Sequence, residues 1–277
     1  MTRLDLPQVT LCCVDTRTPE LALWALGRCL AQASFAQTLL FTDAERLTGC
    51  PPGVTPVHTH IDSVPAYSDF MLRGLLPHVR TSHVLVVQWD GFVLDAQAWR
   101  PEFLAFDYIG APWPRVPGDR GVGNGGFSLR SRKLLQALAD PRMVMSHPED
   151  VCICQLNRDR LEQLHGIRFA PRALAEQFAY ERARVAQPTF GFHGLFNFDE
   201  VLAPAALIAL LRDLPPPMFR GLDAHDLAAQ LLRRGRLDAA SLIIDQRIRL
   251  GMKDRRSLRL RIKRQLARWR QSLGFSS

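Results

Sequence analysis

The segment Ser82–Phe92, SHVLVVQWDGF, decides the fold class of this chain. Apolar β-formers run without interruption from Val84 to Val87, and the run then stops at a polar and glycine-containing group, Gln88, Trp89, Asp90 and Gly91. An unbroken apolar run of this length is typical of a strand buried on both faces of a parallel sheet. The polar group therefore falls at the carboxyl end of a central strand, where open α/β sheets bind ligands.

The preceding segments repeat this pattern. Val9–Asp15 (VTLCCVD) and Gln37–Glu45 (QTLLFTDAE) are apolar runs that end in a carboxylate, and Val54–Ile61 predicts a third strand. Between the first two runs, Thr18 and Pro19 form a helix start, with a capping residue followed by proline at the first helical position. Alternating strands and helices predict an α/β fold, a Rossmann-like, mostly parallel sheet flanked by helices.

The remainder divides into two regions of different texture. We expect an α/β domain over residues 1–199 and a helical C-terminal region over residues 200–277, with a hairpin broken at Arg234–Gly235 and a basic terminal helix. Further elements predicted in the first region are helices over 68–79, from near Ser131, and over 147–166, and short strands within 122–131 and 166–171.

Composition limits the class of protein. The chain has 277 residues and a formal net charge of +8, and it contains no apolar run of the roughly 18–20 residues that a membrane-spanning helix needs. Its start has too short an apolar run for a signal peptide, so we expect a cytoplasmic protein. The six cysteines lack the paired spacing of a zinc site and are expected to be buried, reduced thiols.

Several polar groups are candidates for chemistry. Asp90 can hold a divalent cation that neutralises a leaving diphosphate, although an Asp–Gly pair also starts an ordinary turn. The loop VGNGGFSLRS lets backbone amides of Gly125 and Gly126 approach a ligand, with Asn124 beside them, and a tight hairpin is the alternative. The glycine spacing fits neither a Walker loop nor a dinucleotide fingerprint.

Two later motifs add a base and a metal ligand. Glu149 and Asp150 lie at a predicted helix start, where one of them can take the proton of an attacking hydroxyl or can simply cap the helix. His193, between glycines in FGFHG, can bind a transition-metal ion, or it can be structural.

Taken in order, these motifs resemble a known family. QWDG, DYIGAPW, VGNGGFSLRSR, PEDVCIC, GIRFAP and FGFHG resemble a bacterial family catalogued as a domain of unknown function and assigned to the GT-A glycosyltransferases, over roughly Val54 to Gly194. GGFSLRSR followed by PEDV is also similar to the sugar-lining and base segments of inverting galactosyltransferases.

The resemblance implies a role for each matching residue. Asp90 corresponds to the last Asp of the Asp-x-Asp metal motif, with Mn²⁺ or Mg²⁺ as cofactor, and His193 to the late metal-binding histidine. Asp150 corresponds to the base, and Glu149 to an acceptor-binding residue. The first Asp of the motif is Gln88 here, which replaces a charged contact by an amide. The donor-binding residues implied are Asp15, Thr16, Arg17, Gln88, Trp89, Asp90, Asn124, Gly125 and Gly126.

The implied function is sugar transfer with inversion from a nucleotide sugar, expected to be a UDP-sugar, to a glycan or lipid-linked acceptor in surface polysaccharide synthesis. A nucleotidyltransferase is one alternative, but residues 1–20 lack the basic glycine-rich loop that would hold a triphosphate. The other alternative is a non-catalytic binding module, with a degenerate transferase domain and a basic tail as its working part.

The basic tail suggests a further partner. Residues 253–270 hold nine Lys or Arg against Asp254 alone. Spacings of three and four residues place an apolar face on 253–273, made of Leu258, Ile262, Leu266, Trp269 and Leu273. We expect peripheral association with an anionic membrane surface, at its inner face, and packing on the protein body is the alternative. No nucleic-acid partner is expected, because the segment lacks interleaved aromatic residues for base stacking.

Overall fold

The computed structural model describes residues 3–47, 49–183 and 187–272. In this described part the chain forms two compact units, Met1–His193 and Gly194–Ser277. The domain boundary that the sequence predicts after residue 199 stays a prediction.

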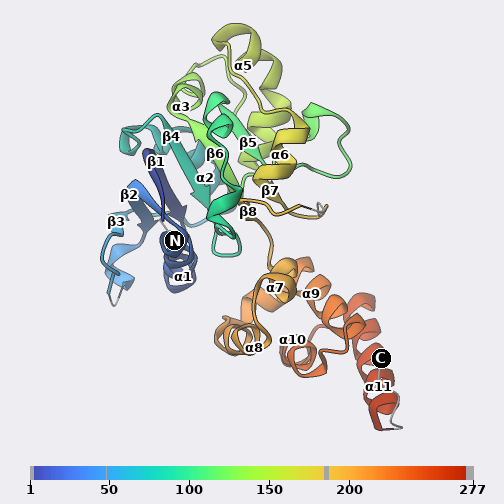
Figure 1. Ribbon diagram of the computed structural model, residues 1–277. Coiled ribbons are helices and arrows are strands. Elements are labelled where there is room, and N and C mark those ends of the chain that lie inside the picture. Colours follow the sequence, from blue (N-terminus) through green and yellow to red (C-terminus); the bar gives the residue numbers. More distant parts are fainter. Residues whose placement is uncertain (1–2, 48, 184–186, 273–277) are drawn as a thin grey trace. The chain divides into compact units, whose positions relative to one another are not determined.

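The first unit is built on a central sheet. Within the described residues this sheet has six strands in the order β3-β2-β1-β4-β6-β5 (Figure 1). The first four in that order are mutually parallel, β6 is antiparallel to β4, and β5 is antiparallel to β6. The prediction of a mostly parallel sheet flanked by helices is thus confirmed. The strand bounds are β1 (Leu4–Val14), β2 (Ala33–Thr42), β3 (Thr55–His58), β4 (His83–Val87), β5 (Tyr108–Gly110) and β6 (Phe127–Ser131).

Alternating side chains of these strands serve both faces of the sheet. Every residue of β4 is buried, as its uninterrupted apolar run predicts. On one face, Cys12, Phe41 and Val86 pack against Met71 and Leu75. α1 (Pro19–Gln32) packs against β1 and β2 through its buried stripe of Leu21, Ala22, Ala25, Leu26 and Cys29.

Two predicted helices are interrupted. The helix expected over 68–79 is α2 (Val64–Asp69), a π-helical turn (Phe70–Gly74) and a 3-10 turn (Leu76–His78), because Pro77 lacks the amide that a continuing helix needs. The helix expected over 147–166 is likewise α4 (Glu149–Val151), a π-helical turn (Cys152–Leu156) and α5 (Arg158–His165). Asn157 lies at the break between the π-helical turn and α5, because its side-chain amide binds the backbone of Val144. Its Oδ1 accepts from Val144 N at 2.8 Å, and its Nδ2 donates to Val144 O at 2.7 Å.

The strand expected in 166–171 is wrong. Only an isolated bridge, Phe169 with Tyr108, forms there. The segment does exchange backbone hydrogen bonds with β5, from Asp107 N to Arg168 O at 2.7 Å and from Ala170 N to Tyr108 O at 3.0 Å. Pro171 ends the pairing because it has no amide hydrogen. The remaining described helices of the first unit are α3 (Arg132–Ala137), which begins beside Ser131 as expected and is capped by the Ser131 side chain, and α6 (Arg172–Phe178).

The order of the strands sets a switch point at one edge of the sheet. From β1 the chain moves to β2 and β3 on one side and then returns to β4 on the other side of β1. Loops leaving the carboxyl ends of β1 and β4 therefore diverge, which is the arrangement that forms ligand sites in open α/β sheets. Asp15 follows β1 directly, and Gln88, Trp89 and Asp90 follow β4.

A second, two-stranded sheet delivers His193 to the same edge. β7 (Ala179–Tyr180) and β8 (Gly191–Phe192) are parallel, and Gly191 also bridges to Val93, just beyond Asp90. The rings of Phe192 and Phe92 meet edge to face at 4.8 Å between centroids. This packing fixes the end of β8 beside the loop that follows β4.

The second unit is helical, which confirms the expected helical C-terminal region. Its described helices are α7 (Phe198–Val201), α8 (Pro204–Asp213), α9 (Leu222–Arg233), α10 (Leu237–Arg249) and α11 (Arg255–Ser272). The hairpin turns at Gly235, whose φ of 69° suits glycine. The buried Arg247 joins three elements, because its guanidinium donates to Phe219 O (2.6 Å), Gly221 O (3.1 Å) and Ser257 Oγ (2.9 Å).

All six cysteines are free thiols, and all but Cys50 are buried. Burial raises the pKa of Cys12 and of Cys29 to about 12, so these side chains are inert apolar packing groups. Among the described helices, none combines the length and the apolar character needed to cross a bilayer.

Candidate active site at the carboxyl edge of the sheet

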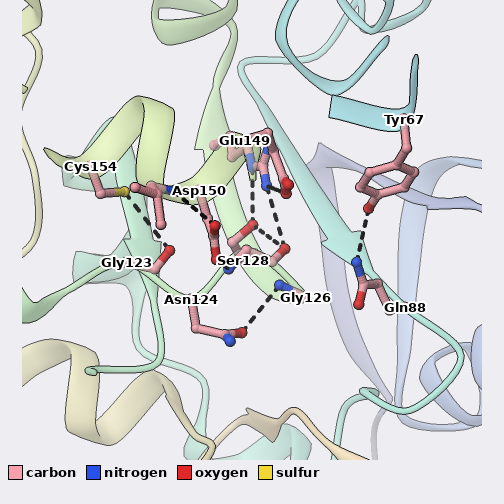
Figure 2. Close-up of polar contacts among 12 residues, drawn as sticks. Tyr67, Gln88, Gly123, Asn124, Gly126, Ser128, Glu149, Asp150 and Cys154 are labelled. Carbon is pink, nitrogen blue, oxygen red and sulfur yellow. Dashed lines mark hydrogen bonds and ion pairs between the residues drawn. The ribbon is translucent and has the colours of Figure 1, made fainter. Parts of the chain in front are cut away.

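The loop Asn124–Gly126, between β5 and β6, lies between Asp150 of α4 and Gln88 at the end of β4 (Figure 2). On one side, Gly125 N donates to Asp150 Oδ2 at 3.2 Å. On the other side, Gly126 O accepts from Gln88 N at 2.9 Å. Asn124 shapes the turn, because its Oδ1 accepts from Gly126 N at 3.1 Å. The loop thus links α4 to the end of β4.

Both glycines are required for close approach. A Cβ atom on Gly126 would lie 2.2 Å from His193 Nε2, and one on Gly125 would lie 2.6 Å from Glu149 Oε1. Neither glycine therefore has space for a side chain. Since consecutive Cα atoms are only about 3.8 Å apart, the loop brings the acidic pair of α4 and the imidazole of His193 close together.

Asp90 and His193 form the first polar cluster. His193 Nε2 lies 3.3 Å from Asp90 Oδ1, and Nδ1 on the other side of the ring lies 3.5 Å from Glu181 Oε1. Parallel pairing of β7 with β8 explains the second contact, because Glu181 and His193 directly follow the paired residues Tyr180 and Phe192. Burial opposes the charged imidazole, but the carboxylates of Asp90 and Glu181 outweigh it and raise the pKa of His193 to about 10.

The donor atoms of this cluster are of the kinds that bind divalent cations. Gln88 Oε1 also faces His193 Nε2, at 3.1 Å. The separations of 3.1 and 3.3 Å are hydrogen-bond and ion-pair distances, and these side chains would hold a divalent cation only once Nε2 is deprotonated. Carboxylate oxygen, amide oxygen and imidazole nitrogen together suit an ion such as Mn²⁺. In the described part of the chain, no group of three or more His, Cys, Asp or Glu side chains could hold a metal ion.

Asp150 has the properties of a base. Its Oδ1 accepts from Val151 N at 2.8 Å and its Oδ2 from Gly125 N at 3.2 Å. Burial, reinforced by the neighbouring Glu149 charge, raises the pKa of Asp150 to about 6. A carboxylate with a pKa near neutrality is a stronger proton acceptor than an ordinary one and is still ionised at pH 7.

Glu149 is held differently from its neighbour. Its side chain is buried, and Oε1 pairs at 3.1 Å with Nη2 of Arg130, whose side chain is fully buried in β6. Arg130 Nε also donates to Ser128 Oγ at 3.0 Å, and Ser128 Oγ donates to Gly125 O at 3.0 Å. Glu149 thus neutralises a buried cation and braces the glycine loop. Its expected contact with an acceptor stays a prediction.

The polar side chains after β1 form hydrogen bonds with other groups of the protein. Asp15 accepts from Arg17 N (2.8 Å), Thr18 N (2.7 Å) and Thr18 Oγ1 (2.7 Å), which shapes the turn into α1. Thr16 Oγ1 donates to Ile61 O at 2.6 Å, and Arg17 is exposed. Their contact with a nucleotide, like that of the half-buried Trp89, stays a prediction.

Three residues at this edge could not be identified from the sequence alone. Arg130 stands in a strand pattern, and only its charge within FSLRS signals a buried partner. Tyr67, whose hydroxyl accepts from Gln88 Nε2 at 3.0 Å, lies in a segment with no motif. Glu181 is a lone acidic residue after β7, and no sequence signal identifies it.

The fold and this edge define an α/β protein with a polar site at the switch point of its sheet. Residues 54–193, just over half of the chain, match the family described as "Protein of unknown function (DUF5672)", and the chain belongs to that family. No curated protein matches the sequence.

Two solved structures are similar at low identity. One is the galactosyltransferase LgtC in complex with donor and acceptor sugar analogues (12% identity, 67% of this chain and 86% of that chain, TM-score 0.39). The other is the mannosyltransferase PcManGT from Pyrobaculum calidifontis in complex with GDP-Man and Mn²⁺ (13% identity, 99% of this chain and 90% of that chain, TM-score 0.41).

The buried pair of Arg130 and Glu149 gives a test of the site's framework. Arg130→Met should lower the free energy of unfolding by about 3–5 kcal/mol, because it leaves the Glu149 carboxylate buried without a partner. The double variant Arg130→Met/Glu149→Leu removes both charges and should recover most of that loss. Urea unfolding measures both. A double variant as unstable as the single one would show that the pair is not what holds this region.

Proposed function

We propose that this chain is a GT-A-type glycosyltransferase that moves a sugar, with inversion, from a nucleotide sugar to an acceptor hydroxyl. The observation that carries the proposal is the pairing of two groups across the Gly125–Gly126 loop. Asp150, with its raised pKa, contacts the first glycine, and the Asp90–His193 cluster abuts the second.

Inversion requires these two groups. The acceptor oxygen forms a bond to the anomeric carbon on one face of the sugar, while the bond to the donor's diphosphate breaks on the other. Asp150 takes the proton of the attacking hydroxyl. A divalent cation held by Gln88, Asp90 and His193 would supply positive charge to the departing diphosphate. The glycine loop lies between these two groups and contacts both of them.

The finer assignments rest on the sequence motifs. A UDP-sugar as donor, and a glycan or lipid-linked acceptor in surface polysaccharide synthesis, follow from the resemblance of GGFSLRSR and PEDV to inverting galactosyltransferases. Asp15, Thr16 and Arg17, after β1, are our candidates for contacts with the nucleotide.

Asp150→Asn tests the base directly. Transfer should fall by about 10²–10⁴-fold, since the amide cannot accept the proton, while donor affinity stays within about twofold. Transfer is measured with a panel of UDP-sugars and donor affinity by calorimetry. Asp159→Asn, which alters a carboxylate 61% exposed on α5, is the matched control and should keep full activity. Full transfer by Asp150→Asn would remove this residue from the mechanism.

The same carboxylate sets a pH dependence. For the native chain, kcat/KM should fall about tenfold per pH unit below pH 6, because only ionised Asp150 is a base. Because folding raises the pKa of Asp150 from 3.8 to about 6, its stabilising contribution is present below pH 4 and is lost as pH rises through 6. Asp150→Asn should therefore be more stable than the native chain at pH 7, by up to about 3 kcal/mol, and not at pH 4.

We also propose that α11 docks on an anionic membrane surface. Leu258, Ile262, Leu266 and Trp269 are 50%, 48%, 52% and 62% exposed. At about 100° per residue they fall within an arc of about 80°. The buried residues of α11, Ser257 and Leu260, lie on the opposite side. The predicted fifth member, Leu273, lies outside the described residues.

Charge supports a lipid surface. Basic residues border both sides of the apolar arc, with Arg259, Lys263 and Arg270 on one side and Arg261 and Arg268 on the other. Like charges along both borders disfavour pairing with a second copy of the helix, whereas anionic headgroups complement them.

Vesicle flotation tests this surface. The full chain should float with vesicles containing phosphatidylglycerol and not with phosphatidylcholine alone, and high salt should weaken binding. Replacing Leu258, Ile262, Leu266 and Trp269 by Ser keeps all charges and should reduce binding at least tenfold. Equal binding by the variant would show that the apolar face does not enter the membrane.

A further inference from the structure

Arg130 is a charged side chain that lies entirely inside the protein. Its exposed fraction is 0%, and that of its partner Glu149 is 5%. Its nitrogen Nη1 is buried and has no hydrogen-bond partner among the protein groups of the described residues. A buried ion pair is often no more stable than a well-packed apolar pair, and an unsatisfied buried donor adds a further cost. Stability alone therefore does not explain why β6 carries an arginine at this position.

Two contacts connect this arginine to the Gly125 carbonyl. Arg130 Nη2 donates to Gly125 O at 3.4 Å, and Nε donates to Ser128 Oγ at 3.0 Å. Because Nε can only donate, the Ser128 hydroxyl accepts from it and gives its own proton to Gly125 O, at 3.0 Å. Ser128 is fully buried as well. Two donors held inside the protein therefore fix the Gly125 carbonyl.

The amide of the same glycine holds the proposed base. Gly125 N donates to Asp150 Oδ2 at 3.2 Å, and the other oxygen, Oδ1, accepts from Val151 N at 2.8 Å (Figure 2). The Val151 contact comes from the same helix as Asp150, whereas the Gly125 contact depends on the conformation of the loop. A glycine has no side chain to limit its backbone dihedrals, so its amide keeps one direction only where other contacts hold the residue. The contacts of Arg130 and Ser128 supply that restraint.

Charge is a second link between these residues. An uncompensated guanidinium beside Asp150 would favour the ionised carboxylate and make it a weaker proton acceptor. The Glu149 carboxylate, 3.1 Å from Arg130 Nη2, offsets that effect. The two charges act on the pKa of Asp150 in opposite directions, Glu149 from the same helix raising it and Arg130 from β6 lowering it.

We propose that Arg130 is a positioning residue for the base, which aims the Gly125 amide at Asp150 through Ser128 and the Gly125 carbonyl, while Glu149 offsets its charge. The inference rests on the proposed function and goes beyond it, because it assigns a part in the reaction to two buried side chains. Since Arg130 is fully buried, it acts only through its neighbours. Its loss should therefore slow the transfer step and leave the binding of both substrates unchanged.

Arg130→Met/Glu149→Leu in the full chain tests the inference, because it replaces both charges by an apolar pair. Its unfolding temperature should stay within a few degrees of the native value. Its kcat for transfer from a UDP-sugar should fall about 10–100-fold, with acceptor KM and UDP affinity within about twofold of native. Ser128→Ala keeps the ion pair and removes only the hydroxyl link, and it should lower kcat about tenfold.

A second buried arginine provides the matched control. Arg158 Nε pairs with Glu162 Oε1 at 2.9 Å, and its Nη1 donates to Asp119 O, away from the Asn124–Gly126 loop. Arg158→Met/Glu162→Gln should keep the native kcat even where it lowers the unfolding temperature.

Glu149→Gln separates the effect of charge from that of position. It leaves the Arg130 charge without an offset, so the acid limb of the kcat/KM profile should move to lower pH by about one unit. In the double variant, which lacks both charges, the limb should stay near pH 6. A purely structural pair would not move the limb in either variant.

Native kcat in the double variant or in Ser128→Ala would overturn the inference, and so would a double variant that does not fold. An acceptor KM that rises while kcat stays native would give Glu149 the acceptor contact that the resemblance implies, and would also overturn it. If Asp150→Asn still abolished transfer in these cases, the proposed function would stand. Absence of transfer by the native chain with every UDP-sugar of the panel would overturn both.

Discussion

The site depends on close contact between the Gly125–Gly126 backbone and the polar side chains on either side of it. Gly125 and Gly126 leave no space for a Cβ atom, because Glu149 lies against the first and His193 against the second. Asn124 and the buried chain of Arg130 and Ser128 hold the loop in this position. A larger residue at either glycine would separate the groups that the proposed reaction needs together.

Much of the fold could be predicted from the sequence because burial and periodicity act locally. The apolar runs before Asp15 and Asp90 give both the strands and their carboxyl ends, and the edge that these ends share follows from the direction of parallel strands. The strand expected in 166–171 failed for one nonlocal and one local reason. Its partner β5 is only three residues long, and Pro171 removes the next donor.

The positions of the motif-bearing residues along one edge of the sheet could be predicted, whereas the contacts that support them could not. Gln88, Asp90, Asn124, Gly125, Gly126, Glu149, Asp150 and His193 lie along one edge, as their positions after strands and at a helix start suggest. Tyr67, Arg130 and Glu181 act through contacts between segments far apart in the chain, which no spacing rule reveals. Glu149 shows the same limit, since its carboxylate serves a buried arginine that the sequence gives no reason to place beside it.

The most direct test of the account is a crystal structure of the chain with UDP and Mn²⁺. The account predicts the diphosphate at the carboxyl ends of β1 and β4, with the ion on Asp90 and the Asp150 carboxylate across the Gly125–Gly126 loop from it. A diphosphate bound elsewhere, with the Asp90 carboxylate turned away from it, would contradict the claim that this edge holds the leaving group of a sugar donor.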